Sequence, residues 1–413
     1  MKFPRIFRAE EKANPIGASL LVGAGDGYAR WEDRTSYIRE GYQRNPVIYM
    51  AVEEIAKAIA GLRLELVRNK GKDNEEYLDD DHPVMKLLRR PNPMQGGHAF
   101  RKAVFIEFLT LGEQAIAQPI GQRHPAELWQ VDPGEVEVKP GRGGIPSAYI
   151  HRRSGQTTEF PVRGVTNPRA DLFFYKRFNP QNYWRGQSPL MAGGIAGDIH
   201  NRGTDWNDML LRNAAKPSGI VTFKGGDPSD ETVRRLKEWF KRAFQGSANA
   251  GEVPVLTGGA EWKQTSLSPL DMDFGNSMTE AKKLIAGVYG VPLPLIDNEA
   301  ATFANMEMAK ERFYIDTVIP LANEWLEAFG AWLLPAWGDD LTLCIDMDDI
   351  PALEAVRNRK FDRVMKALGQ GIITMDEARD EIGYSPLTTE DDDSADAEDA
   401  AAKAYGNGQQ NPR

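Results

Sequence analysis

Apolar residues recur every three to four positions along several stretches of the chain, and this spacing predicts long helices. The first predicted helix follows Asn45, which suits an N-cap, has Pro46 in its first turn and ends at Gly61. Its apolar positions at helical spacing are Val47, Met50, Ile55, Ile59 and Leu62.

Residues 189–216 predict a second long helix, with Ser188 as its N-cap. One face collects the apolar residues Ile195, Ile199, Trp206 and Leu210. Four glycines lie in the same stretch: Gly193, Gly194, Gly197 and Gly203. Each weakens a helix by roughly 1 kcal/mol relative to alanine, so this helix needs a packing partner, and glycine permits close approach.

Two more helices are predicted downstream, over 269–291 and over 304–337. The latter carries an apolar stripe made of Tyr314, Val318, Leu321, Trp325, Phe329 and Trp332. Pro320 lies inside it and should kink it, because proline cannot donate to the carbonyl of Asp316. At the C-terminal end, Thr374 and Glu377 predict a capping box.

Alternating apolar and polar residues predict short strands between the helices. In the first 188 residues these are "LRLELV", "AELWQVDPGEVEVKP", "SAYIHR", "TEFPVRGVTN" and "DLFFYKRF". This part of the chain is therefore expected to be an α+β region with an antiparallel sheet. Residues 217–268 predict a separate β-α-β-β unit with a hairpin around Thr257-Gly258-Gly259.

The stretch "GVYGVPLPLIDNEAATFANM" at 287–306 separates two predicted helices. Its two prolines prevent the first helix from continuing. Loops of this length are usually functional or disordered. A loop with a function is favoured, and a bare linker stays as the alternative.

The charge of the chain is uneven. The formal net charge is −10, and residues 390–413 alone hold seven acidic and two basic residues, which predicts a disordered acidic tail. The other 389 residues are only mildly acidic, with 53 acidic and 48 basic residues. A protein that reads DNA sequence usually has a basic face, so any contact with nucleic acid is expected to be loose.

No catalytic, metal or cofactor site is predicted. There is no phosphate-binding P-loop, "GAGDG" at 23–27 is read as a plain turn, and the five histidines are scattered. "DMDD" at 346–349 is read as a solvated strand end in preference to a cation site. The single cysteine, Cys344, excludes an intrachain disulfide, and the sequence contains no apolar run long enough to span a membrane.

In order and spacing, several stretches together resemble portal proteins of tailed bacteriophages and gene transfer agents. They include "NPVIYMAVEEIAKAIAGLRLEL", "FNPQNYWRGQSPLMAG", "KPSGIVTF", "AGVYGVPLPLI" and "ITMDEARDEIGYSPL", within residues 45–388. Residues 1–40 lie outside the resemblance. The resemblance implies an α+β portal fold: a wing at 1–188, stem helices at 189–216 and 269–291, a clip at 217–268, a tunnel loop at 292–303, a kinked helix returning to the wing at 304–349 and a crown at 350–389.

The resemblance also implies a function. Such a protein forms a ring, usually of twelve subunits, at one capsid vertex, and double-stranded DNA passes through it during packaging and ejection. The large terminase, head-completion or adaptor proteins and the major capsid protein would be its partners; it would be part of the virion and assemble in the bacterial cytoplasm. Tunnel-loop candidates are Leu295, Asp297, Asn298, Glu299, Thr302 and Phe303, and clip candidates for partner docking are Lys224, Arg234, Glu238 and Arg242. An α+β enzyme with an unrecognised site and another head–tail connector component are the alternatives.

Overall fold

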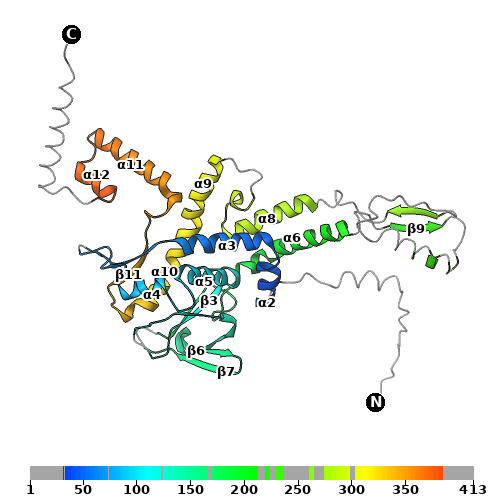
Figure 1. Ribbon diagram of the computed structural model, residues 1–413, viewed down its shortest axis with the longest axis horizontal. Coiled ribbons are helices and arrows are strands. Elements are labelled where there is room, and N and C mark those ends of the chain that lie inside the picture. The colour runs from blue at the N-terminus through cyan, green and yellow to red at the C-terminus, as the bar shows by residue number, and fades with distance from the viewer. Residues whose placement is uncertain are drawn as a thin grey trace, which may run out of the picture. The chain divides into compact units, whose positions relative to one another are not determined.

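A computed structural model describes residue 31 and residues 33–384 with internal gaps. The gaps are 73, 122–123, 165–168, 213–218, 265–273, 298–302 and all of 224–259 except 229, 231, 233–235 and 238. The chain divides into two compact units, Met1–Ile345 and Asp346–Arg413, which are described separately (Figure 1). Among the described helices, none is both long and apolar enough to cross a membrane.

The helix α3 (Pro46–Gly61) packs against α5 (Gly97–Leu111) at the centre of the first unit. The predicted cap is confirmed, because the Asn45 side chain accepts hydrogen bonds from the N–H groups of Val47 and Ile48, both at 3.0 Å. The predicted apolar face is partly wrong, since Met50 is 40% exposed. The buried face consists of Val47, Ile48, Ala51, Val52, Ile55, Ala56, Ile59 and Ala60.

Short antiparallel sheets surround these helices, and the described part of the first 188 residues contributes to three of them instead of the one expected. In the first, β1 (Leu64–Arg68) lies between β2 (Glu76–Leu78) and β11 (Leu341–Ile345). In the second, β3 (Glu113–Ala117) lies between β4 (Trp129–Val131) and β8 (Leu172–Lys176). The third contains β5 (Val136–Pro140), β6 (Pro146–Arg153) and β7 (Gln156–Pro161). The helix α4 (Pro83–Arg89) precedes α5.

Helix α10 (Ile319–Leu333) completes the core with an aromatic cluster. Trp325 lies 5.3 Å from Phe105 of α5, and Phe329 lies 5.5 Å from Phe173 of β8, measured between ring centroids. The Trp332 indole donates to the carbonyl of Ala170 at 2.9 Å. The predicted stripe is therefore confirmed as the face that closes the core.

The expected effect of Pro320 takes a specific form. Between α9 (Phe303–Phe313) and α10 lies a π-helical turn, η7 (Tyr314–Val318), in which the N–H of Ile319 donates to Tyr314, five residues back. Such a turn holds one extra residue, so the hydrogen bonding shifts register just before the proline.

A carboxyl group on α5 is half-buried beside the second sheet. Gln130 donates from Nε2 to Oε2 of Glu107 at 3.1 Å, and burial raises the pKa of Glu107 to about 8. The folded protein therefore keeps this proton at pH values where the unfolded chain releases it.

Replacement of Glu107 by glutamine should make folding less sensitive to pH. Because the pKa of Glu107 is higher in the folded state, its stabilisation is complete below about pH 4.5 and is lost as the pH rises through 8. Urea unfolding should show Glu107→Gln to be more stable than the native protein at pH 9, by on the order of 2 kcal/mol, and no more stable at pH 4.5. The exposed Glu137→Gln serves as the control, and an equal gain at both pH values would contradict the prediction.

The described residues of the second unit form two α-helices, α11 (Glu354–Gly369) and α12 (Met375–Glu381). The predicted capping box is confirmed: the N–H of Glu377 donates to the Thr374 hydroxyl at 3.2 Å, and the N–H of Thr374 donates to the Glu377 carboxylate at 2.7 Å. In the "DMDD" stretch, Asp346 accepts from the N–H of Asp348 at 2.9 Å. Within the described residues, no three His, Cys, Asp or Glu side chains form a group that could hold a metal ion.

Candidate functional site

Two long helices of the first unit lie side by side, α6 (Pro189–Arg212) and α8 (Phe274–Tyr289) (Figure 1). The start of α6 is capped as predicted: the Ser188 hydroxyl accepts from the N–H of Leu190 at 3.1 Å. The same hydroxyl donates to the carbonyl of Thr110 on α5 at 2.6 Å. The cap therefore also joins α6 to the core.

A buried ion pair fixes the chain just before α6. Glu113, which is 5% exposed, pairs with Arg185, and the N–H of Gly186 donates to its other oxygen at 3.0 Å. The Arg185 guanidinium also donates to the carbonyl of Val136 at 2.7 Å. Gly112, at φ +76, lies so close to Gln187 that a side chain there would overlap the backbone. The helix therefore leaves the core from a rigid base.

One face of α6 is covered by α8. Gly193 faces Val288, and Gly203 faces Met278. His200, which is 5% exposed, lies on the same face, and burial together with the charge of Lys282 keeps its pKa below the usual value. Glycine and a neutral histidine allow the two helices to lie close together.

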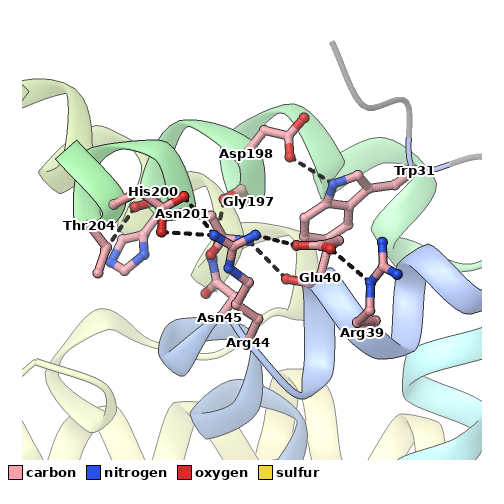
Figure 2. Close-up of polar contacts among 11 residues, drawn as sticks. Trp31, Arg39, Glu40, Arg44, Asn45, Gly197, Asp198, His200, Asn201 and Thr204 are labelled. Atoms are coloured by element: carbon pink, nitrogen blue, oxygen red, sulfur yellow. Dashed lines mark hydrogen bonds and ion pairs between the residues drawn. The ribbon is translucent and has the colours of Figure 1, made fainter. Parts of the chain in front are cut away.

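A second face of α6 is covered by residues 31 and 33–45, which we name the N-terminal clamp. It includes the short helix α2 (Arg34–Ser36) and a π-helical turn, η1 (Tyr37–Tyr42). Trp31 is 4% exposed, and its indole donates to Asp198 at 2.8 Å (Figure 2). Its ring lies against Gly194 and Gly197, where any larger residue at 197 would overlap it.

Polar contacts continue the clamp along α6, as Figure 2 shows. The Asn45 side chain donates to Asn201 at 2.9 Å, and Asn201 donates to the carbonyl of Glu40, also at 2.9 Å. Arg44 pairs with Glu40 and with Asp205, both at 2.6 Å, and its hydrogen bond holds the pKa of Glu40 below the ordinary value.

Sequence reasoning missed this clamp. The residues before 41 matched nothing recognisable, and the contacts join positions more than 150 apart in the chain. The visible signal was the group of glycines on α6. The sequence predicted that this glycine-bearing helix needs a packing partner, and the near neighbours of Gly194, Gly197 and Gly203 are Trp31 and Met278 of the same chain.

A third face of α6 carries exposed apolar side chains, with the exposed Arg202 among them. We name it the apolar stripe: Met191 (45% exposed), Ile195 (69%), Ile199 (40%) and Met209 (57%). The sequence predicted that Ile195 and Ile199 share a face, and they do. Neither α8 nor the clamp covers that face.

The segment after α8 is fixed at its base. Gly290, at φ +67, ends the helix, with the N–H of Val291 donating to Ala286 at 2.9 Å. The Thr317 hydroxyl in η7 donates to the carbonyl of Gly290 at 2.6 Å. A short 3₁₀ turn, η5 (Leu293–Leu295), follows.

The predicted loop residues are only partly visible. Leu295 is half-buried, and Asp297 forms an ion pair with Lys282 of α8 at 3.0 Å. Asn298, Glu299 and Thr302 lie outside the described residues, and Phe303 is described only as the first residue of α9. The positive charge of Lys282 therefore offsets the negative charge of Asp297 at this position.

In the predicted β-α-β-β unit, β9 (Gly219–Phe223) pairs antiparallel with β10 (Ala260–Gln264). Arg234 and Glu238 are exposed. Lys224, Arg242 and the hairpin predicted around 257–259 lie outside the described residues.

Comparisons with known proteins agree with this architecture. A sequence model of the phage portal protein family matches residues 46–383. Solved subunits from the neck of an empty and of a native gene transfer agent particle, the latter computed with C12 symmetry, are 32% and 31% identical, with a TM-score of 0.65. In both cases the match covers 89% of this chain and 99% of the solved chain. The probable portal protein of Streptomyces phage phiC31 is 26% identical over 353 residues, 82% of this chain and 74% of its own length.

These matches extend over most of the chain, so its mixed helical and sheet fold is that of a portal protein. The chain belongs to the phage portal protein family, as the sequence resemblance predicted. The family match starts at residue 46, immediately after the N-terminal clamp.

Proposed function

We propose that this protein is the portal subunit of a phage or gene transfer agent head. Twelve copies form a ring in the neck, and double-stranded DNA passes through the centre of the ring when it is packaged and ejected. Membership of the portal family supports this proposal, as does similarity to neck subunits of gene transfer agent particles.

The exposed apolar stripe on α6 is the main structural observation that supports the proposed ring. Exposed apolar side chains that share one face of a helix mark an interaction site. The glycine-lined faces of the same helix are already covered by α8 and by the clamp, and the proposal pairs the stripe with a different surface of a neighbouring copy. An interface between two different surfaces of the same protein generates a ring when its rotation closes.

The proposal is tested on the purified full-length chain. Light scattering and negative-stain images should show rings of several hundred kilodaltons, formed by the protein alone or after addition of the major capsid protein. Particles that stay at the 46.0 kDa of a single chain at every concentration and salt, with and without capsid protein, would contradict it.

The channel is proposed to conduct DNA without gripping it. Basic walls bind phosphate with a strength that depends on salt and would slow a moving duplex, whereas the body of this chain is mildly acidic. We assign the loop at 292–303 to the channel, with its base held by the Lys282–Asp297 ion pair and by Thr317. Portal family members are structural proteins, and a separate terminase motor would supply the energy for packaging.

The unit at 217–268 is proposed to be the clip, on which the terminase docks before head-completion proteins replace it. Its described side chains include an exposed arginine and an exposed glutamate, Arg234 and Glu238, and charges at the rim of an interface mainly steer association.

Charge reversal on the clip should weaken motor binding. We expect the double variant Arg234→Glu, Glu238→Arg to lower the association rate with the large terminase roughly tenfold at low salt and to leave ring formation unchanged. Surface plasmon resonance on immobilised rings measures this rate. Arg152→Glu with Glu137→Arg, which exchanges the charges of an exposed ion pair between β6 and β5, is the matched control. Unchanged terminase binding by the double variant would show that these clip residues do not contribute to the docking surface.

A further inference from the structure

The N-terminal clamp precedes the residues that match the sequence model of the portal family, and it covers a whole face of the helix that carries the apolar stripe. We propose that the clamp is a positioning element for assembly: it holds α6 in the orientation in which the apolar stripe binds a second copy of this chain. This inference rests on the proposed ring and adds a determinant of its formation.

The clamp and the stripe extend along the same part of α6. Clamp contacts begin at Leu190, whose side chain lies against Gly41, and end at Asp205, which pairs with Arg44. The stripe runs from Met191 to Met209. The turns that carry Met191, Ile195 and Ile199 are therefore held from behind or beside by the clamp, whereas Met209 lies one turn beyond its last contact.

The contacts also fix the rotation of α6 about its own axis. With α8 packed on one face and Trp31 on another, the third face can point in only one direction. Binding is stronger when the interface is already ordered, because less conformational entropy is lost on association. A fixed helix thus presents Ile195 and Ile199 to a neighbouring subunit at a lower cost than a mobile one.

Buried polar groups make the clamp specific. Asn45 is fully buried and Asn201 is 6% exposed, and they satisfy each other and the carbonyl of Glu40. Displacing the segment by even one helical turn would leave these groups without partners, which is costly in a buried setting. The clamp can therefore bind α6 in only one register.

Gly194 and Gly197 leave room for the Trp31 ring, but they lower the helix propensity of α6. Alanine at 194 or 197 would favour the helix, but a Cβ at Gly197 would overlap the Trp31 ring. By contrast, a Cβ at Gly193 would lie 3.6 Å from Val288, an ordinary contact. Two substitutions with the same effect on helix propensity thus differ only in their effect on the clamp.

This difference defines the experiment. In the full-length chain, we expect Gly197→Ala to raise the concentration needed for half-maximal ring formation at least tenfold, whereas Gly193→Ala stays within twofold of the native protein. Sedimentation velocity gives these concentrations. Hydrogen exchange should show faster exchange of amides 190–205 in Gly197→Ala, with the amides of α3 unchanged.

A double-mutant cycle separates the clamp from a general effect on α6. Trp31→Ala should weaken assembly by a similar factor. The double variant Trp31→Ala with Gly197→Ala should assemble no more weakly than Trp31→Ala alone, because both substitutions remove the same contact between the Trp31 ring and α6. Trp31→Phe, which keeps a ring but loses the bond to Asp198, should assemble to an intermediate extent and guards against a variant that fails to fold. The near-ultraviolet circular dichroism of each variant checks its tertiary structure.

The outcomes are distinct. The proposed role of the clamp would be refuted if Gly197→Ala formed rings at the same concentration as the native protein, or if the two substitutions had additive effects. Either result would leave the proposed ring unaffected. Failure of the native protein to form rings under any condition would overturn the proposed function and the clamp's role with it.

Discussion

Aspartate in place of Ile195 and Ile199 should leave a folded chain that no longer forms rings. Both side chains are exposed in the single subunit, at 69% and 40%, so the substitutions remove no contact from the folded core. In the proposed ring both are buried against a neighbour, and each buried isoleucine contributes about 1.5–3 kcal/mol. An unpaired carboxylate buried there adds a further penalty, so the association constant of each contact should fall by at least about a thousandfold.

Conservative variants provide the matched control. Ile195→Leu with Ile199→Leu keeps the apolar area and should still assemble, whereas the aspartate pair should sediment as a single chain. Thermal unfolding should place both variants close to the native protein, since surface substitutions usually change stability by less than about 0.5 kcal/mol. Normal rings from the aspartate variant would show that the stripe is not an interface.

Replacement of residues 297–302 by a glycine-serine segment of equal length should preserve rings but reduce packaged DNA about tenfold. The ends of the loop are held by contacts that the replacement does not touch, chiefly the Thr317 bond to Gly290 and the turn at Leu293–Leu295. The replacement removes the side chains that we assign to the channel, among them Asp297 and Glu299. Nuclease-protected DNA per particle, produced with all other particle components present, measures packaging and retention.

The Lys282–Asp297 ion pair requires its own control, because the replacement also removes Asp297. Lys282→Gln keeps the loop and breaks only the pair. If the loop acts through its own side chains, Lys282→Gln should package within about twofold of the native protein, since a partly exposed ion pair contributes roughly 1 kcal/mol or less. Full packaging by the glycine-serine variant would exclude the loop from the DNA path.

Helix termini were the most predictable part of the fold. Asn45, Ser188 and Thr374 each accept the backbone N–H that their position in the sequence implied. A capping side chain binds an N–H group only two or three residues further along the chain, so both partners of the hydrogen bond can be identified from the local sequence. The same holds for the α10 stripe, where Trp325 and Phe329 follow the helical period.

The apolar stripe on α6 was half predictable. Periodicity placed Ile195 and Ile199 on one face, but periodicity cannot say which face of a helix is covered within the chain. In a monomeric protein that face would be the core. Here Trp31 and α8 cover the other faces, and the apolar side chains stay exposed in the single subunit.

By itself, the sequence determined the order of helices and strands, the caps, the absence of recognisable catalytic motifs and the resemblance to portal proteins. All of these depend on neighbours a few residues apart or on the order of whole segments. Only the tertiary structure decided that Trp31 reaches Asp198, that β1 pairs with β11 and that Glu107 keeps its proton up to about pH 8. These contacts join distant parts of the chain or depend on burial, and both arise from the way the whole molecule packs.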